Sequence, residues 1–138
     1  HGEVHCLKQY YQLDESKKLS TNDLIFITTH EPCTMCMSAI TWAGFDNYFY
    51  FFSHEDSQNE FSIPHDLKIM KELYALDAGG YRRENSFFKA YNIIDLLRNE
   101  QDVNGNSYTS QIEIIRSEYQ KLSNQYQSGK SNNNIPLN

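Results

Sequence analysis

The sequence predicts an α/β fold in which helices pack on both faces of a parallel sheet. Two short runs, residues 24–29 and 48–52, are apolar and rich in β-branched or aromatic side chains, as in strands covered on both faces. Segments with helical character follow them, at residues 33–43 and 65–76. Strands that alternate with helices pair in parallel, because each helix carries the chain back across one face of the sheet.

The first half of the chain is expected to fold as a helix, a strand and a second helix. Apolar side chains recur at three- and four-residue steps in residues 1–13, which predicts a helix. Residues 14–22 are polar and turn-forming, and they lead into the first strand. Pro32 is expected to end that strand and Gly44 the helix that follows, because proline lacks a backbone donor and glycine favours a helix C-terminus.

The second half is expected to continue the alternation after the second strand. Residues 53–62 predict a charged loop, and Pro64 is well placed to open the third helix. The pair Gly79-Gly80 is expected to end that helix. Residues 87–93 predict a third strand, while residues 95–98 leave the choice of secondary structure open.

A long amphipathic helix, residues 107–127, is expected to close the domain. Its apolar side chains follow alternating three- and four-residue steps and form one stripe, made of Ile112, Ile115, Tyr119, Leu122 and Tyr126. The simplest interpretation is a stripe that faces the core, and a subunit contact is the second. Residues 1–127 are therefore expected to belong to one domain, followed by a polar C-terminal tail at residues 128–138.

Composition and charge exclude several classes of protein. The 138 residues suit one domain, and 10 Tyr, 8 Phe and 1 Trp favour a packed core over disorder. The longest apolar run is far too short to cross a membrane, and no secretion signal is visible. Three cysteines do not make a disulfide framework, so a cytoplasmic chain with a metal site is expected. The net charge of −6 disfavours a general nucleic-acid-binding surface.

Cys33 and Cys36 stand at the start of the second expected helix, directly after the first strand. Their spacing puts both sulfurs on one face of the first turn, where free N–H groups and the positive helix end favour thiolates. Two thiolates provide half of a zinc site. His1 can supply a third ligand, and Glu3 can reach a water molecule at the open fourth position, which distinguishes a catalytic zinc from a structural one.

His1-Gly2-Glu3 followed by Pro32-Cys33-Thr34-Met35-Cys36 resembles the signature of the zinc-dependent cytidine/deoxycytidylate deaminase superfamily. The resemblance covers residues 1–52 and extends more loosely to residue 93. It implies a three-layer α-β-α fold, a mixed sheet with parallel C-terminal strands, and one Zn²⁺ held by His1, Cys33 and Cys36. It also implies hydrolytic deamination, in which zinc hydroxide attacks a carbon that bears an exocyclic amine, ammonia leaves, and Glu3 shuttles the proton.

The string Glu31-Pro32-Cys33-Thr34-Met35-Cys36, with Ala39, Ile40, Trp42 and Ala43 later in the same helix, looks most like guanine deaminases and tRNA adenosine deaminases. The resemblance implies a nucleobase or nucleoside/nucleotide substrate with a guanine- or cytosine-type amine, and a homodimer is the expected assembly. A subunit that edits adenosine to inosine in tRNA is one alternative, which the net charge disfavours. A catalytically silent, zinc-stabilised interaction module is another.

The family's sheet has five strands, whereas three are expected here. We therefore expect that residues 1–127 are the C-terminal part of a single deaminase domain, and that an upstream helix and β-hairpin are missing from this chain.

Eight residues near the expected strand ends and the following helix are candidates for substrate binding. Ligands bind at the carboxyl ends of strands in such sheets, and aromatic rings can stack on a base. The candidates are His30, Glu31, Pro32, Trp42, His54, Glu55, Asp56 and Phe61. Residues 102–113 resemble a calcium-binding loop, but Ser107 occupies the position that requires glycine, so a turn is the better interpretation.

Overall fold

The computed structural model describes residues 1–76 and 80–132 of the chain. In these residues, short 3₁₀ turns at Glu15–Lys17 and Thr21–Asp23 lie between α1 and β1, and a third, Lys130–Asn132, follows α6. The strands are β1 (Phe26–His30), β2 (Asn47–Phe52) and β3 (Lys89–Asn92). The helices are α1 (Gly2–Tyr11), α2 (Thr34–Trp42), α3 (His54–Asn59), α4 (His65–Tyr74), α5 (Ile93–Leu97) and α6 (Thr109–Gly129).

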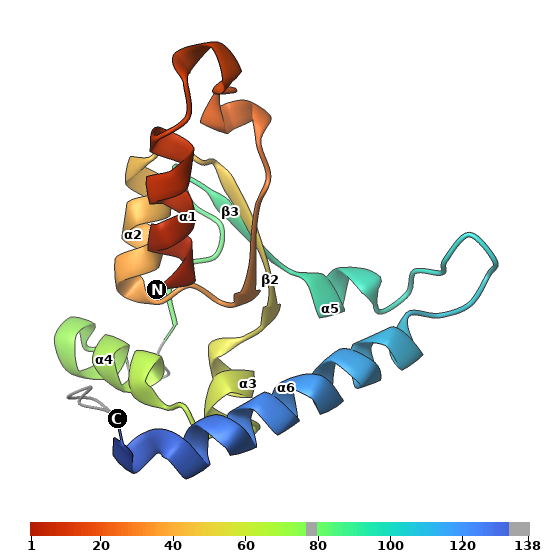
Figure 1. The fold of residues 1–138 in the computed structure, drawn as a ribbon. Helices are drawn as coiled ribbons and strands as arrows, with labels where there is room; N and C mark the ends of the chain where they lie inside the picture. The colour runs from red at the N-terminus through yellow and green to blue at the C-terminus, as the bar shows by residue number, and fades with distance from the viewer. Residues whose placement is uncertain (77–79, 133–138) are drawn as a thin grey trace.

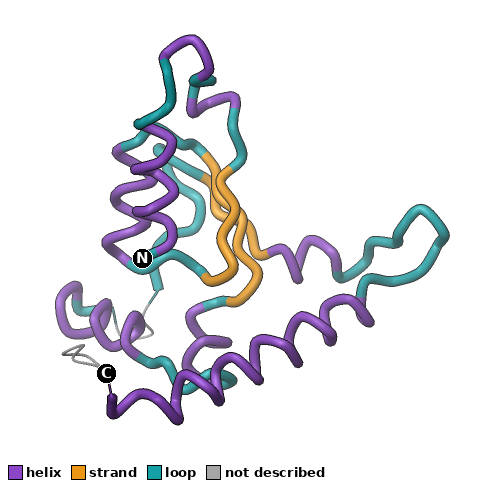
Figure 2. Tube along the Cα trace, viewed as in Figure 1, coloured by secondary structure: helices purple, strands orange, loops and turns teal. Residues whose placement is uncertain are grey.

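The three strands form one parallel sheet in the order β1-β2-β3, which confirms the expected α/β fold. Phe26 of β1 pairs with Tyr48 of β2, and Tyr48 pairs with Ala90 of β3. Figures 1 and 2 show α1 and α2 side by side on one face of this sheet, while α5 follows β3 on the other side. The parallel C-terminal strands that the family resemblance implies are thus present.

The core lies between the sheet and the pair α1–α2. Alternate residues of β2 are fully buried: Tyr48 and Tyr50 lie in this core, and Phe52 packs on Phe61 and Tyr119. The other members of this core come from the helices, the turn after α2 and the ends of β1 and β3, namely Leu7, Phe26, Ile40, Phe45 and Phe88. Their packing fixes the start of α1 against the start of α2, which carries the expected metal ligands.

The expected charged loop at residues 53–62 is wrong for its first part, because residues 54–59 form α3. Ser53 accepts a hydrogen bond from the Asp56 N–H, and the Asp56 carboxylate accepts one from the Ser53 N–H. This reciprocal capping box satisfies two N–H groups that a helix start leaves free. The spacing of Ser53 and Asp56 is visible in the sequence and is typical of a helix start. The segment has no apolar periodicity, however, so a helix was not expected there.

The end of α4 differs from expectation, and the undecided segment becomes a helix. Helix α4 ends at Tyr74, and its C-cap Ala75 adopts a left-handed conformation with φ of +53°. The helix therefore stops before the expected Gly79-Gly80 pair, of which Gly79 lies outside the described residues. Residues 93–97, which include most of the undecided segment 95–98, form α5, and the Asn92 side chain caps it by accepting from two backbone N–H groups.

Helix α6 is confirmed, but its apolar stripe faces the core only in part, where Tyr119 packs on the buried rings of Phe52 and Phe61. Ile115, Leu122 and Tyr126 are exposed, and the buried side chain of this helix is Ser123. The Ser123 hydroxyl donates to the Phe61 carbonyl at 3.0 Å, and Arg116 pairs with Glu60, so polar contacts hold the helix against the segment after α3. Figure 1 shows α6 running past α3 and below the sheet.

The last helix ends later than expected. Helix α6 continues through Gly129, two residues beyond the expected helix end at residue 127. The rest of the expected tail from residue 133 lies outside the described residues. Asp102 accepts hydrogen bonds from the N–H groups of Asn104 and Asn106, which confirms a turn in the segment that resembles a calcium loop. Among the described helices, none combines the length and apolar character of a membrane span.

Candidate metal centre and active site

The junction of β1 and α2 places two thiols at a helix start. Cys33 is the N-cap of α2, and its sulfur accepts a hydrogen bond from the Cys36 N–H at 3.5 Å. Cys36 is fully buried and Cys33 is 9% exposed. Because the first turn presents free N–H groups and the positive helix end, this position stabilises negative charge on sulfur.

The N-terminus of α1 brings His1 to these thiols. The His1 Nδ1 atom lies 3.5 Å from the Cys33 sulfur and 3.4 Å from the Cys36 sulfur. The His1 carbonyl accepts from the His5 N–H, which fixes the histidine on the first turn of α1. Residues 32 to 35 positions apart in the sequence therefore meet because α1 packs beside α2.

The spacing of these three side chains suits zinc. Their ligand atoms all lie within 4.8 Å of one another. Zinc bonds of about 2.3 Å to sulfur and about 2.0–2.1 Å to nitrogen, at tetrahedral angles, would separate a ligand nitrogen from a sulfur by roughly 3.6 Å. The two nitrogen–sulfur distances are close to that value, and the donor set of one imidazole and two thiols is one that zinc prefers. The site therefore supports one zinc ion.

The two thiols differ in their protonation. The Cys36 thiol and the Cys36 N–H both hydrogen-bond to Cys33, and they lower the pKa of Cys33 to about 6 against the opposing effect of burial. The hydrogen bond to the Cys33 sulfur and burial raise the pKa of Cys36. Cys33 is thus ready to bind a cation as a thiolate, whereas Cys36 must release its proton on binding.

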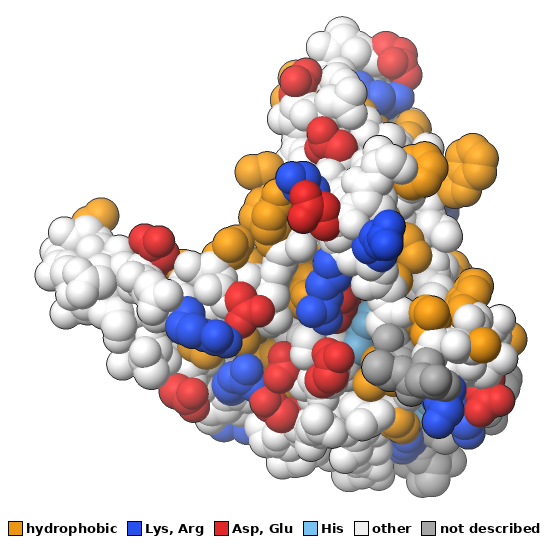
Figure 3. Space-filling view, turned by 180° about the vertical axis from the view of Figure 1, so that it is seen from behind, with side chains coloured by type: hydrophobic (Ala, Val, Ile, Leu, Met, Phe, Trp, Pro, Cys, Tyr) orange, Lys and Arg blue, Asp and Glu red, His pale blue; other side chains and the backbone are white. Residues whose placement is uncertain are grey.

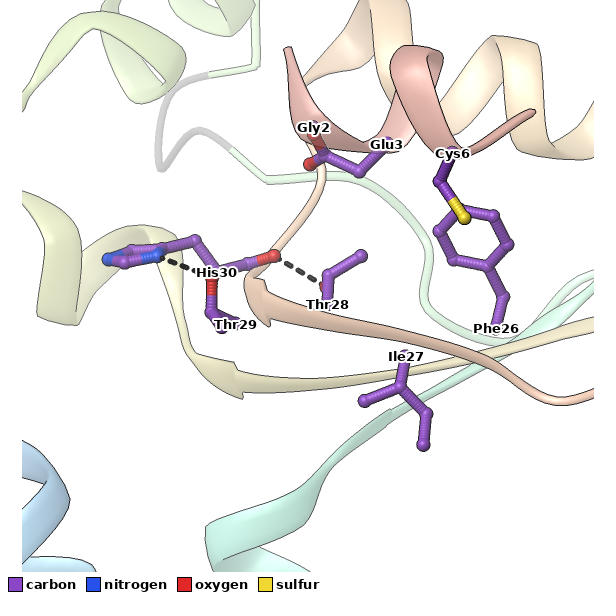
Figure 4. Close-up of a pocket in the computed structure, with 8 residues that line it drawn as sticks. All are labelled: Gly2, Glu3, Cys6, Phe26, Ile27, Thr28, Thr29 and His30. Atoms are coloured by element: carbon purple, nitrogen blue, oxygen red, sulfur yellow. Dashed lines mark hydrogen bonds between the residues drawn. The ribbon is translucent and has the colours of Figure 1, made fainter. Parts of the chain in front are cut away.

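Glu3 lies on the first turn of α1 beside a cavity of about 320 Å³. The cavity runs between α1 and β1, and its lining is Gly2, Glu3, Cys6 and residues 26–30. In Figure 4, Glu3 extends over the end of β1 that carries His30, whereas Cys6 lies over Phe26 one turn further along the helix. The size is at the lower end of the range for small-molecule sites.

His30 ends β1 and closes one side of this cavity. Its ring packs against Phe52, Phe61 and Tyr119, with centroids 5.1, 5.6 and 5.3 Å away. Burial lowers the pKa of His30, although Glu3, Asp56 and Asp66 pull it upward. His30 is therefore held in place by an aromatic cage, on the same cavity as Glu3.

Glu31 and His54, two other substrate candidates, are buried next to each other. The Glu31 carboxylate accepts two hydrogen bonds from Arg83, at 2.8 and 2.9 Å, and one from the His54 N–H at 3.1 Å. The His54 Nδ1 atom lies 3.4 Å from the same carboxylate. Protein groups thus surround the Glu31 carboxylate.

The remaining candidates occupy different places. Pro32 is fully buried between the end of β1 and Cys33. Phe61 is buried among the rings that pack around His30. Glu55 is exposed and lies 3.7 Å from Arg83, while Asp56 caps α3 and lies 3.7 Å from Arg116.

Trp42 is the substrate candidate that lies far from the cluster. It is 91% exposed at the last residue of α2, whereas the cysteines are at the first turn. Nine residues of rise separate Trp42 from Cys33, or roughly 13 Å along the helix axis. The structure does not bring its ring to the metal cluster.

Sequence reasoning missed three residues near the site. Arg83 was visible only as part of a basic pair, and its partner Glu31 is 52 positions away. Tyr119 packs on the buried Phe52, as expected of the α6 stripe, but its contact with His30 is not predicted by that stripe. Asp66 lies in the first turn of α4 and is partly buried, and this burial raises the pKa of its carboxyl. Glu3, His30 and His54 are among its electrostatic neighbours. None of these three had a local motif that could have identified it.

Comparison with known proteins agrees with this geometry. Residues 1–52 match the family described as the cytidine and deoxycytidylate deaminase zinc-binding region. No curated protein and no solved structure matches the chain. The matched segment contains His1, Cys33 and Cys36, which the fold brings together. Residues 1–52 therefore resemble the zinc-binding region of cytidine and deoxycytidylate deaminases, and their cluster of one histidine and two cysteines supports one zinc ion.

Proposed function

We propose that this protein is a zinc-dependent hydrolytic deaminase that acts on a nucleobase or a nucleoside/nucleotide with a guanine- or cytosine-type amine. The observation that carries the proposal is the cluster of His1, Cys33 and Cys36, with Glu3 two residues after His1 on a cavity of about 320 Å³. Three protein ligands leave one tetrahedral position for water, which is the pattern of catalytic zinc.

His1, Cys33 and Cys36 would hold the metal. When bound, zinc supplies a Lewis acid that acidifies water and so makes a hydrolytic nucleophile available near neutral pH. Glu3 accepts a proton and delivers it to the leaving amine, since a carboxylate in this position can act first as a base and then as an acid. His30 and its aromatic cage hold the end of β1 that lines the cavity.

A small molecule fits the proposal better than an RNA. The net charge is −6, and the face in Figure 3 carries basic and acidic side chains interspersed, without a continuous basic surface. Binding a phosphate backbone requires many cations gathered on one surface. The proposal also includes a cytoplasmic location, a role in nucleobase metabolism and a homodimer.

Ammonia release from a panel of purines, pyrimidines, nucleosides and nucleotides tests the proposal. We expect one substrate group to release ammonia with zinc-loaded protein. Glu3→Gln should lower that rate by about 10²–10⁴-fold, the usual contribution of a positioned acid–base group. The zinc content of this variant should stay at one per chain, because Glu3 is not among the three clustered ligands.

Glu72→Gln is the matched control, because it removes an exposed carboxylate from α4 without touching the cavity. It should keep the full rate. If Glu3→Gln kept zinc and released ammonia as fast as the unaltered protein, the proposed role of Glu3 would be wrong. A panel without any product, from protein that holds zinc, would instead favour a zinc-stabilised interaction module.

A further inference from the structure

Arg83 forms a two-pronged ion pair with a buried carboxylate. Its Nε atom donates to one oxygen of Glu31 at 2.8 Å, and its Nη2 atom donates to the other at 2.9 Å. The guanidinium carbon lies 5.5 Å from the centre of the buried Tyr50 ring. Such paired hydrogen bonds fix the carboxylate in orientation as well as in position, because both groups are planar.

The Glu31 side chain depends on this pair. It is 1% exposed, while the Arg83 side chain is 44% exposed. Its other partner among the described residues is His54, whose backbone N–H donates at 3.1 Å and whose ring Nδ1 lies 3.4 Å away. A buried carboxylate that loses an ion-pair partner must recruit water, take up a proton or move. The ion pair with Arg83 therefore holds the Glu31 carboxylate in its buried position.

Both ends of this contact are attached to rigid elements. The Arg83 carbonyl accepts from the Ala90 N–H of β3 at 2.8 Å. The Glu31 N–H donates to the Phe52 carbonyl at the end of β2 at 2.7 Å. The buried residue Pro32 alone separates Glu31 from the metal ligand Cys33. The Glu31 side chain and the Cys33 sulfur are consequently attached to the same short, buried stretch of backbone.

We propose that Arg83 is a positioning residue for the metal centre, which acts through Glu31 to hold the Cys33 thiol at its binding distance from His1. The inference concerns the same site as the proposed function, but it rests on the zinc cluster and not on deamination. Residues behind the ligands of a metal site commonly tune affinity in this way, by about 10–100-fold.

Binding of Co²⁺ to metal-free protein, followed by competition with Zn²⁺, tests this role without any substrate. The charge-transfer absorption from thiolate to cobalt reports that both sulfurs bind. We expect Arg83→Gln to weaken both metals by at least about tenfold. Arg82→Gln is the matched control, because the neighbouring arginine is exposed and its side chain makes no ion pair among the described residues. It should bind both metals like the unaltered protein.

Two further variants separate positioning from general loss of structure. Arg83→Lys keeps the charge but not the paired hydrogen bonds, so an intermediate affinity is expected. In a Glu31→Gln background, Arg83→Gln should cause little additional loss, because the group through which it acts is already altered. Circular dichroism and thermal melting of the metal-free variants show whether each still folds.

Three results would overturn the proposal. Arg83→Gln could fold and bind cobalt as tightly as Arg82→Gln does. The effects of Glu31→Gln and Arg83→Gln could add fully. Arg83→Lys could retain full affinity, which would make the paired geometry irrelevant. Absence of deamination on every substrate would leave these metal-binding results unaffected, so the failure of either proposal is recognisable.

Discussion

The imidazole of His30 is half-buried and packs against aromatic rings. Phe52, Phe61 and Tyr119 surround it, and burial lowers its pKa more than Glu3 and the other nearby carboxylates raise it. The unfolded chain exposes this imidazole to water, where a histidine has a pKa of about 6.5. Protonation is thus easier in the unfolded chain than in the folded one.

This difference predicts a pH-dependent stability. As the pH falls through about 6.5, the unfolded chain binds a proton that the folded chain resists, so the free energy of unfolding decreases. His30→Gln should remove this contribution and flatten the profile between pH 7.5 and pH 5. Urea unfolding of metal-free protein at several pH values measures it, since zinc release then plays no part.

His5→Gln removes an exposed histidine from the same helix as Glu3 and is the matched control. If its profile flattened as much as that of His30→Gln, the burial of His30 would not be the cause.

At the scale of elements, helix α3 depends on its cap. The helix has only six residues, and a helix this short is not stable by itself. Ser53 and Asp56 exchange hydrogen bonds at its start, and Asp56 also lies 3.7 Å from Arg116 of α6. The cap therefore shapes the segment on which α6 packs.

Ser53→Ala should lower the free energy of unfolding by about 1 kcal/mol, the usual cost of losing an N-cap hydroxyl. Urea denaturation measures the change in the transition midpoint. Ser20→Ala is the control, because Ser20 precedes a 3₁₀ turn without making a side-chain cap. Equal losses in the two variants would mean that the capping box contributes nothing specific.

At the scale of the whole molecule, the metal ligands join two distant parts of the chain. His1 begins α1, while Cys33 and Cys36 lie at the start of α2. A zinc ion bound to all three would hold these two helix ends together only in the folded protein. Ligands that bind the folded state alone stabilise it by mass action.

Removal of zinc by a chelator should therefore lower the melting temperature. With free zinc at a thousand times its dissociation constant, the stabilisation is about 4 kcal/mol, which corresponds to roughly 14 °C for a chain of this size. Calorimetry with and without chelator measures the shift.

Cys36→Ser should abolish this shift, because Cys36 is one of the three clustered ligands. Cys6→Ser should keep it, because Cys6 is a free cysteine on the same helix as Glu3 but outside the cluster. A shift that survives in Cys36→Ser would place the metal elsewhere.

Local patterns in the sequence were enough to predict the three strands, the main helices and the metal ligands. Residue spacing carries this information: alternation and apolar runs predict strands, and two cysteines three positions apart at a helix start face one way. The polar helix α3 was missed because its stabilising contacts are caps rather than an apolar face. The orientation of α6 was missed because periodicity shows that a helix has an apolar stripe, not which surface covers it.

The sequence by itself therefore determined which residues could bind zinc and in which elements they lie. The tertiary structure alone decided that Arg83 meets Glu31 across 52 positions, and that Tyr119 reaches His30. Trp42 is close to the cysteines in sequence, but it lies at the opposite end of α2 and is exposed. The physical reason is that ion pairs and ring contacts depend on distance in space, which only the packing of sheet and helices sets.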